Sequence, residues 1–109
     1  MKILISSFTF LPERSGVSYV VFEHARYFAK KGHEVTVVTS TNSDRSNKDY
    51  EGIKIVEFNI DGGPLLTNFY RGEIIGYINF LRKALKEYDQ IFFHGWQIWA
   101  TDLLLFVRN

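Results

Sequence analysis

The chain has no cysteine, so it forms no disulfide, offers no thiolate to a metal ion and carries no cysteine nucleophile. A chain of this kind suits a reducing compartment, and we expect a cytoplasmic protein. Long apolar runs are missing as well. The longest late run, from Leu103 to Val107, is far below the roughly 18 to 20 residues that cross a bilayer. Ser6 and Ser7 interrupt the apolar opening before it reaches the roughly 7 to 15 residues of a signal peptide. We therefore expect neither a membrane span nor a secretion signal.

Neither sign of charge dominates, because 13 Lys and Arg residues stand against 12 Asp and Glu residues. No stretch concentrates basic residues as a phosphate-tracking surface needs, so we expect no nucleic-acid partner. Four basic residues lie beside an apolar helix face, namely Arg71, Arg82, Lys83 and Lys86. We expect a solvated face with snorkelling side chains, and peripheral contact with an anionic membrane is the alternative.

Apolar residues suffice for one compact domain, since 46% of the 109 residues are hydrophobic and 17% are aromatic. Strand patterns cover residues 2–7, 34–40, 53–60 and 89–95. Helical patterns cover residues 16–31 and 69–86, and a further one begins at Trp96. This alternation predicts an α/β fold that is Rossmann-like, with a mostly parallel sheet between two helical layers.

The expected strand order is 3-2-1-4, numbered along the chain, which puts the carboxyl ends of the first and fourth strands side by side. Residues 41–52 are polar, turn-rich and without apolar periodicity, which predicts a mobile surface loop. This twelve-residue connector contains no helical pattern. It therefore favours an antiparallel third strand, and a parallel edge strand stays open.

Gly16 opens the first helix, where unpaired backbone N–H groups and the helix dipole attract an anion such as phosphate. The alternative is a glycine that only turns the chain into the helix, with Ser15 as the N-cap. Neither G-x-G-x-x-G nor a P-loop with its lysine occurs in the chain. The NAD and ATP fingerprints are therefore missing.

His94 ends the fourth strand, just before a glycine that permits close approach. An imidazole there can hydrogen-bond a sugar hydroxyl or move a proton, and the alternative is a partly buried structural histidine. We expect His24, on the apolar helix face, and His33, after the helix cap, to be structural. The three histidines are far apart in sequence and have no supporting carboxylates, so we expect no metal site.

The two flanking loops hold further candidates. Trp96 and Trp99 follow His94 and can stack on a sugar ring, although core packing of the last helix is the favoured explanation. Glu13 and Arg14 in the first loop are candidates for acceptor contacts and are equally ordinary loop charges. The residues that we predict to bind substrate beside a catalytic His94 are Glu13, Ser15, Gly16, Trp96 and Gln97.

Four stretches of the chain carry a family likeness: MKILISSFTFLPERSGVS, HARYFAKKGHEVTVVTS, YEGIKIVEF and YDQIFFHGW. Together they resemble the N-terminal domain of GT-B glycosyltransferases of family 4, the retaining "group 1" sugar transferases. The resemblance runs along essentially the whole chain. It implies one of two Rossmann-like domains that face each other across a cleft, with the acceptor mainly on the N-terminal domain and the nucleotide-sugar mainly on the C-terminal one.

By this resemblance, Gly16 matches the second glycine of the loop that approaches the donor diphosphate. His94 matches the histidine that lines the sugar and acceptor site. Ser15 departs from the family's first glycine, and Phe92 stands where many members have an earlier histidine.

The resemblance implies transfer of a sugar from a nucleotide-sugar to an acceptor hydroxyl with retention, without an obligatory metal or other cofactor. The acceptor class stays open among saccharides, lipid-linked acceptors and small molecules. The E-x7-E motif of the family's C-terminal domain has no counterpart here. We therefore expect residues 1–109 to be an incomplete acceptor-side domain without its donor-binding partner domain, and inactive alone. The rival hypothesis is a non-catalytic α/β binding or partner module.

Overall fold

The computed structural model describes residues 1–7, 9–12, 16–42, 45, 49–50, 52–62 and 70–94. Its elements follow in the order β1 (Lys2–Ser7), α1 (Gly16–Lys30), β2 (Glu34–Ser40), β3 (Asp49–Tyr50), β4 (Ile53–Phe58), β5 (Ile60–Gly62), β6 (Tyr70–Gly72), α2 (Ile74–Glu87) and β7 (Gln90–His94). Strands β4, β2, β1 and β7 form a parallel sheet in that order, and the short β3 pairs antiparallel with β4 at its edge. The Rossmann-like fold and the expected strand order are both confirmed.

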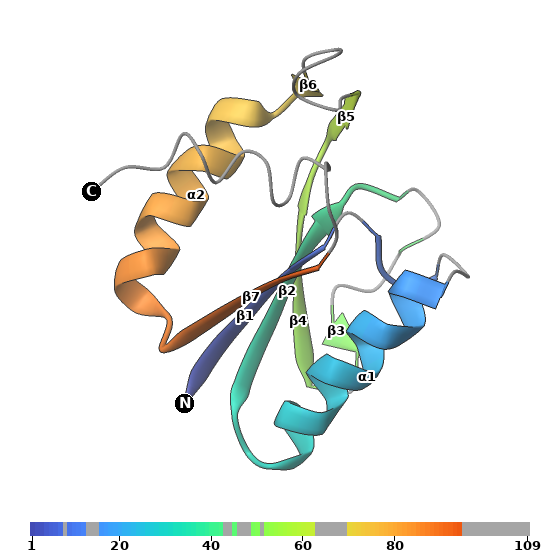
Figure 1. Ribbon diagram of the computed structural model, residues 1–109, viewed down its shortest axis with the longest axis vertical. Helices are drawn as coiled ribbons and strands as arrows, with labels where there is room; N and C mark the ends of the chain where they lie inside the picture. Colours follow the sequence, from blue (N-terminus) through green and yellow to red (C-terminus); the bar gives the residue numbers. More distant parts are fainter. Residues whose placement is uncertain are drawn as a thin grey trace.

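The two helices lie on opposite faces of the sheet (Figure 1). Side chains alternate between the faces of a strand, and β1 shows this directly. Ile3 and Ile5 pack in the cluster that contains Val21 of α1, whereas Leu4 packs in the cluster that contains Leu81 of α2. Because β1 is covered on both faces, its apolar run is continuous rather than alternating.

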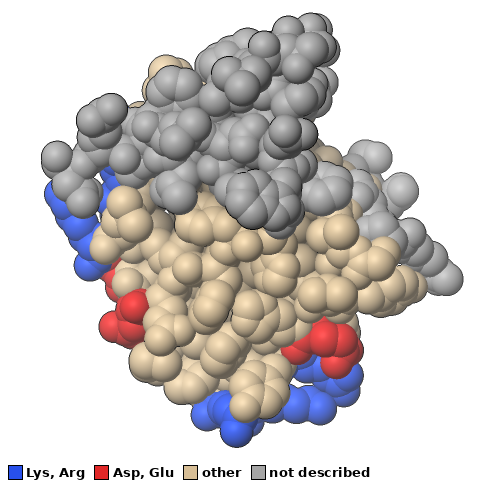
Figure 2. Space-filling model, in the orientation of Figure 1, with Lys and Arg blue, Asp and Glu red and all other residues tan. Residues whose placement is uncertain are grey.

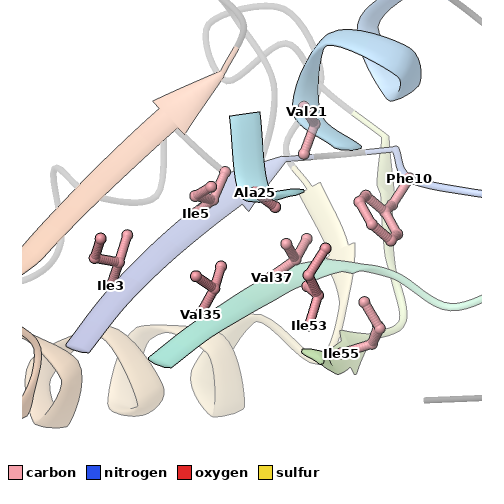
Figure 3. Packing of buried hydrophobic residues seen from close by; sticks show 9 residues of the cluster. All are labelled: Ile3, Ile5, Phe10, Val21, Ala25, Val35, Val37, Ile53 and Ile55. Atoms are coloured by element: carbon pink, nitrogen blue, oxygen red, sulfur yellow. The ribbon is translucent and has the colours of Figure 1, made fainter. Parts of the chain in front are cut away.

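The core on the α1 side joins three neighbouring strands to one helix (Figure 3). Val21 and Ala25, one helical turn apart, face β1 and β2, and all nine residues of the cluster are at most 5% exposed. Each large aliphatic side chain buried in this way contributes about 1.5 to 3 kcal/mol of transfer free energy. This packing fixes the position of α1 on one face of the sheet.

The third predicted strand is β4, and it runs parallel to β2, so the antiparallel prediction was wrong. The connector from β2 rejoins the sheet at the outer side of β4. It comes back as β3, which pairs antiparallel with β4, and turns at Gly52 with φ +85°. The strand also ends earlier than expected, because Asn59 separates β4 from β5.

The second helix begins at Ile74 and not at residue 69, because Tyr70–Gly72 form β6 and pair with β5. At the end of this hairpin, Gly72 has φ +110°, and a Cβ there would collide with the carbonyl group of Asn59. The Asn59 N–H also donates to Glu73 Oε1 at 2.8 Å, and the Glu73 N–H donates to the Asn59 carbonyl at 2.8 Å. These contacts hold the residues before α2 in an extended hairpin.

Many of the charged side chains on one face of the protein lie on or near the two helices. In the view of Figure 2, Lys, Arg, Asp and Glu side chains gather along α2 and near the end of α1, and uncharged side chains fill the middle. Lys83 and Glu87 of α2, for example, form an exposed ion pair of 3.8 Å. Both α1 and α2, the helices within the described ranges, fall short of the length and apolarity of a membrane span.

Candidate functional site

The carboxyl ends of β1 and β7 lie side by side, as expected from the strand order. Ser7, the last residue of β1, is in register with His94, the last residue of β7. Ligands of open α/β sheets bind at such an edge, beside the loops that leave the strands. His94 therefore occupies the position that its place in the sequence predicted.

Helix α1 brings a second imidazole to His94. The distance between His24 Nδ1 and His94 Nε2 is 3.0 Å, and both side chains are partly buried. The prediction of a merely structural His24 missed this contact, because 70 residues separate the two histidines in sequence. Within the described ranges, no three His, Cys, Asp or Glu side chains come together as a metal ion would need.

Aromatic rings surround the histidine pair. The His24 ring lies edge-on to Phe92 at 4.8 Å between centroids, and it lies 5.2 Å from Phe28. Phe28 and Phe92 stack on each other at 5.8 Å. Phe92 thus packs against the histidine of the helix.

The partly buried position of the two rings lowers the pKa of both imidazoles. Burial lowers the pKa of His24. Burial, and secondly the charge that His24 would carry, lower the pKa of His94. Since an ordinary histidine has a pKa near 6.5, both imidazoles are neutral at pH 7. One ring then donates an N–H to the other, and the tautomers of the two rings are coupled.

The loop that leaves β1 is fixed by its own polar groups. Ser7 Oγ donates to the carbonyl of Thr9 at 2.9 Å and accepts from the Thr9 N–H at 3.3 Å, and both residues are buried. The next residue, Phe10, is fully buried and packs against Phe22 of α1. The chain therefore leaves the sheet in a defined direction before it reaches α1.

Arg45 ties this loop to the ends of two further strands. Its side chain is 1% exposed, and Nη1 lies 2.6 Å from Glu57 Oε2 of β4. The guanidinium also donates to the carbonyls of Leu11 at 2.8 Å, Ser40 at 2.8 Å and Phe10 at 3.3 Å. A planar guanidinium with five N–H donors is suited to such a junction.

The buried Arg45 corrects the prediction that residues 41–52 form a mobile surface loop. A polar segment without periodicity resembles a solvated loop, and the sequence does not say which of its charges is paired inside the protein. Glu57 was the signal in the sequence that could have predicted a buried cation. It stands within an apolar strand, and a buried carboxylate needs a cation as its partner.

Gly16 is the first residue of α1 and is exposed. A Cβ at this position would meet nothing within 4 Å, and its φ lies outside the left-handed region. Neither packing nor backbone strain among the described residues therefore demands a glycine there. Binding of an anion at this helix start stays a prediction.

The other predicted site residues, Glu13, Ser15, Trp96 and Gln97, lie outside the described residues. The same holds for Arg14, Gly95, Trp99 and the last predicted helix. Of the predicted set, the structure therefore places His94 and Gly16. It adds His24, which sequence reasoning did not assign to the site.

Comparison with protein families agrees with this architecture. The family model described as Glycosyltransferase Family 4 matches residues 14–108, which is most of the chain. No curated protein gives a significant match to the chain. The family match includes α1 with His24 and β7 with His94, and it confirms the resemblance to the N-terminal domain of GT-B enzymes that the sequence motifs indicated. The chain therefore belongs to glycosyltransferase family 4.

Proposed function

We propose that this domain is the acceptor-side half of a retaining glycosyltransferase, which moves a sugar from a nucleotide-sugar to an acceptor hydroxyl. The observation that carries the proposal is His94 at the carboxyl edge of the sheet, in register with Ser7, in a chain of glycosyltransferase family 4. Three observations support this assignment: His94 at the carboxyl edge of the sheet, the exposed Gly16 at the start of α1, and the family match.

The proposed reaction exchanges one bond at the anomeric carbon for another. The bond from this carbon to the phosphate oxygen breaks, and a bond to the acceptor oxygen forms on the same face of the sugar. The proton of the acceptor hydroxyl leaves with the nucleoside diphosphate. The protein contributes by positioning the acceptor and by stabilising the charge that develops on the phosphate, and we expect no obligatory metal.

His94 is the residue that we assign to the reacting sugar or acceptor. A neutral imidazole at the edge of the sheet can accept a hydrogen bond from a hydroxyl or donate one to a sugar oxygen. Its lowered pKa keeps it neutral at pH 7, so both of these modes are available without placing a cation beside the acceptor.

The exposed start of α1 is the element that we assign to the donor diphosphate. Gly16 is exposed at the first turn, where backbone N–H groups point outward and the helix dipole favours an anion. The remaining contacts to the donor would come from a second domain. We therefore propose that this domain is inactive without a donor-binding domain.

The experiment measures sugar transfer by the complete protein with UDP-glucose, GDP-mannose and ADP-glucose as trial donors. Trial acceptors are free saccharides and an organic extract of lipid-linked acceptors. Release of nucleoside diphosphate gives the rate, and NMR of the product gives its anomeric configuration. The 109-residue chain is assayed in parallel.

The proposal expects acceptor-dependent release with one donor, a product with the donor's anomeric configuration, and no transfer by the chain alone. An inverted product contradicts the retaining mechanism, and transfer by the chain alone contradicts the need for a second domain. Binding of a sugar or nucleotide without any transfer contradicts the enzyme and supports a binding module instead.

A further inference from the structure

We propose that His24 is a positioning residue of the site: its Nδ1 engages Nε2 of His94 and so leaves Nδ1 of His94 as the nitrogen that faces the sugar or acceptor. This inference rests on the proposed function and deepens it. It adds His24, from the middle of α1, to a site that the sequence placed on the strand ends, their loops and the first residue of that helix.

The first argument is the geometry of the pair. His24 Nδ1 and His94 Nε2 are 3.0 Å apart, which is the usual separation of a hydrogen bond with a nitrogen donor. The bond joins α1 to the last residue of β7. Since Nε2 is engaged in this way, a ligand that hydrogen-bonds the His94 ring must use Nδ1.

The second argument is that two phenyl rings, one from α1 and one from β7, pack against His24 of the pair. His24 and Phe28 are four residues apart on one face of α1, and Phe92 and His94 are two residues apart on one face of β7. The centroid distances are 5.2 Å from His24 to Phe28, 4.8 Å to Phe92 and 5.2 Å to His94, and 5.8 Å from Phe28 to Phe92. The phenyl rings of Phe28 and Phe92 thus restrict the rotation of the His24 ring, which contacts His94.

The third argument is proton counting. A neutral imidazole carries one proton, on either Nδ1 or Nε2. If His24 donates to His94 Nε2, the proton of His94 is on Nδ1, and His94 donates to its ligand. If His94 donates through Nε2, its Nδ1 accepts from a hydroxyl instead. The direction of the hydrogen bond between His24 and His94 therefore determines whether His94 donates to its ligand or accepts from it.

Two substitutions at position 24 separate the hydrogen bond from the packing. His24→Leu keeps an apolar side chain between Phe28 and Phe92 and removes the bond. His24→Asn places an amide atom close to the former Nδ1 and can keep the bond. The matched control is His33→Leu, because the His33 ring also contacts Phe28, at 5.9 Å, but lies beside Met1 at the other end of the sheet.

The first readout is nitrogen NMR of the histidine side chains in the protein at pH 7.5, which distinguishes the two neutral tautomers without any substrate. We expect His94 to hold one tautomer in the parent protein and in His33→Leu. We expect an average of both tautomers in His24→Leu, and a single tautomer again in His24→Asn. Unchanged nitrogen shifts of His94 in His24→Leu would overturn the inference.

The second readout is kcat/KM for sugar transfer by the complete protein. Loss of one hydrogen bond corresponds to about a tenfold loss of rate, which we expect for His24→Leu but not for His24→Asn or His33→Leu. Equal rates for His24→Leu and His33→Leu would overturn the positioning role. Absence of transfer by the parent protein would instead overturn the proposed function, and the NMR result would still decide whether His24 fixes the His94 ring.

Discussion

Arg45 joins three separate parts of the fold through its guanidinium group. It pairs with Glu57 at 2.6 Å and donates to backbone carbonyls of the loop after β1 and the end of β2. We expect Arg45→Met to lower the free energy of unfolding by about 3 to 5 kcal/mol, because the Glu57 carboxylate stays buried without its guanidinium. Urea unfolding followed by circular dichroism measures this loss.

Arg45→Lys is the matched control for this substitution. Lysine keeps the positive charge but lacks the planar fork that reaches several carbonyls, so we expect a smaller loss than for Arg45→Met. A loss below about 1 kcal/mol for Arg45→Met, the range of an exposed ion pair, would contradict the role of Arg45 as a buried junction.

The histidine pair predicts a pH dependence of stability. Burial lowers the pKa of both His24 and His94 in the folded protein, whereas in the unfolded chain each is near 6.5. Between the lowered values and 6.5, the unfolded chain binds more protons than the folded protein. The free energy of unfolding therefore falls as the pH is lowered from 7.5 through 6.5 to 5.5.

The double variant His24→Leu/His94→Gln tests the source of this dependence. Urea unfolding of the parent and of the variant at pH 7.5, 6.5 and 5.5 gives the two slopes. We expect a flatter slope in the variant, because it lacks both buried imidazoles. Equal slopes in the two proteins would assign the pH dependence to other groups.

Single residues differ in how far the sequence could place them. His94 ends a short apolar strand, so local pattern was enough to put it at the edge of the sheet. His24 meets it only because α1 packs on β1 and β2 with a particular rotation, which depends on the buried Val21 and Ala25. Arg45 stands in a polar segment, where composition does not distinguish a buried cation from a solvated one.

At the scale of elements, the hairpin of β5 and β6 sets where α2 begins. Gly72 has φ +110°, and a Cβ there would meet the Asn59 carbonyl. We expect Gly72→Ala to destabilise the protein by more than the roughly 1 to 3 kcal/mol of a strained backbone alone. The melting temperature and urea unfolding measure the effect.

Gly32→Ala is the control for backbone strain without collision. Gly32 has φ +89°, and a Cβ there would meet nothing within 4 Å. We expect its substitution to destabilise the protein by about 1 kcal/mol. If Gly72→Ala and Gly32→Ala had the same effect, the close approach of Asn59 would not constrain the hairpin.

The two errors in the predicted elements, the direction of β4 and the start of α2, have a common physical cause. Strands β1, β2 and β7 and helix α1 have strong local periodicity, and their bounds were predicted to within a residue or two. The direction of β4 depends on a two-residue strand, β3, that is too short to show a pattern. The start of α2 depends on pairing between β5 and β6, which an amphipathic pattern over residues 69–86 does not show.

At the scale of the whole molecule, strand order and family membership point to the same edge of the sheet. The order β4-β2-β1-β7 brings the ends of β1 and β7 together, and connection rules for parallel sheets predicted this from the sequence. The family match over residues 14–108 agrees with the motifs at the strand ends. What the sequence did not predict is that His24 of α1 lies against His94.

The most direct test of the central claim is kcat/KM for sugar transfer by the complete protein with His94→Ala, compared with His33→Ala. Removal of a group that hydrogen-bonds the reacting sugar or acceptor is expected to lower kcat/KM by about 10²-fold or more. The account predicts this loss for His94→Ala and a rate within about twofold of the parent for His33→Ala. Parent-like rates for both variants would contradict the assignment of His94 to the site of transfer.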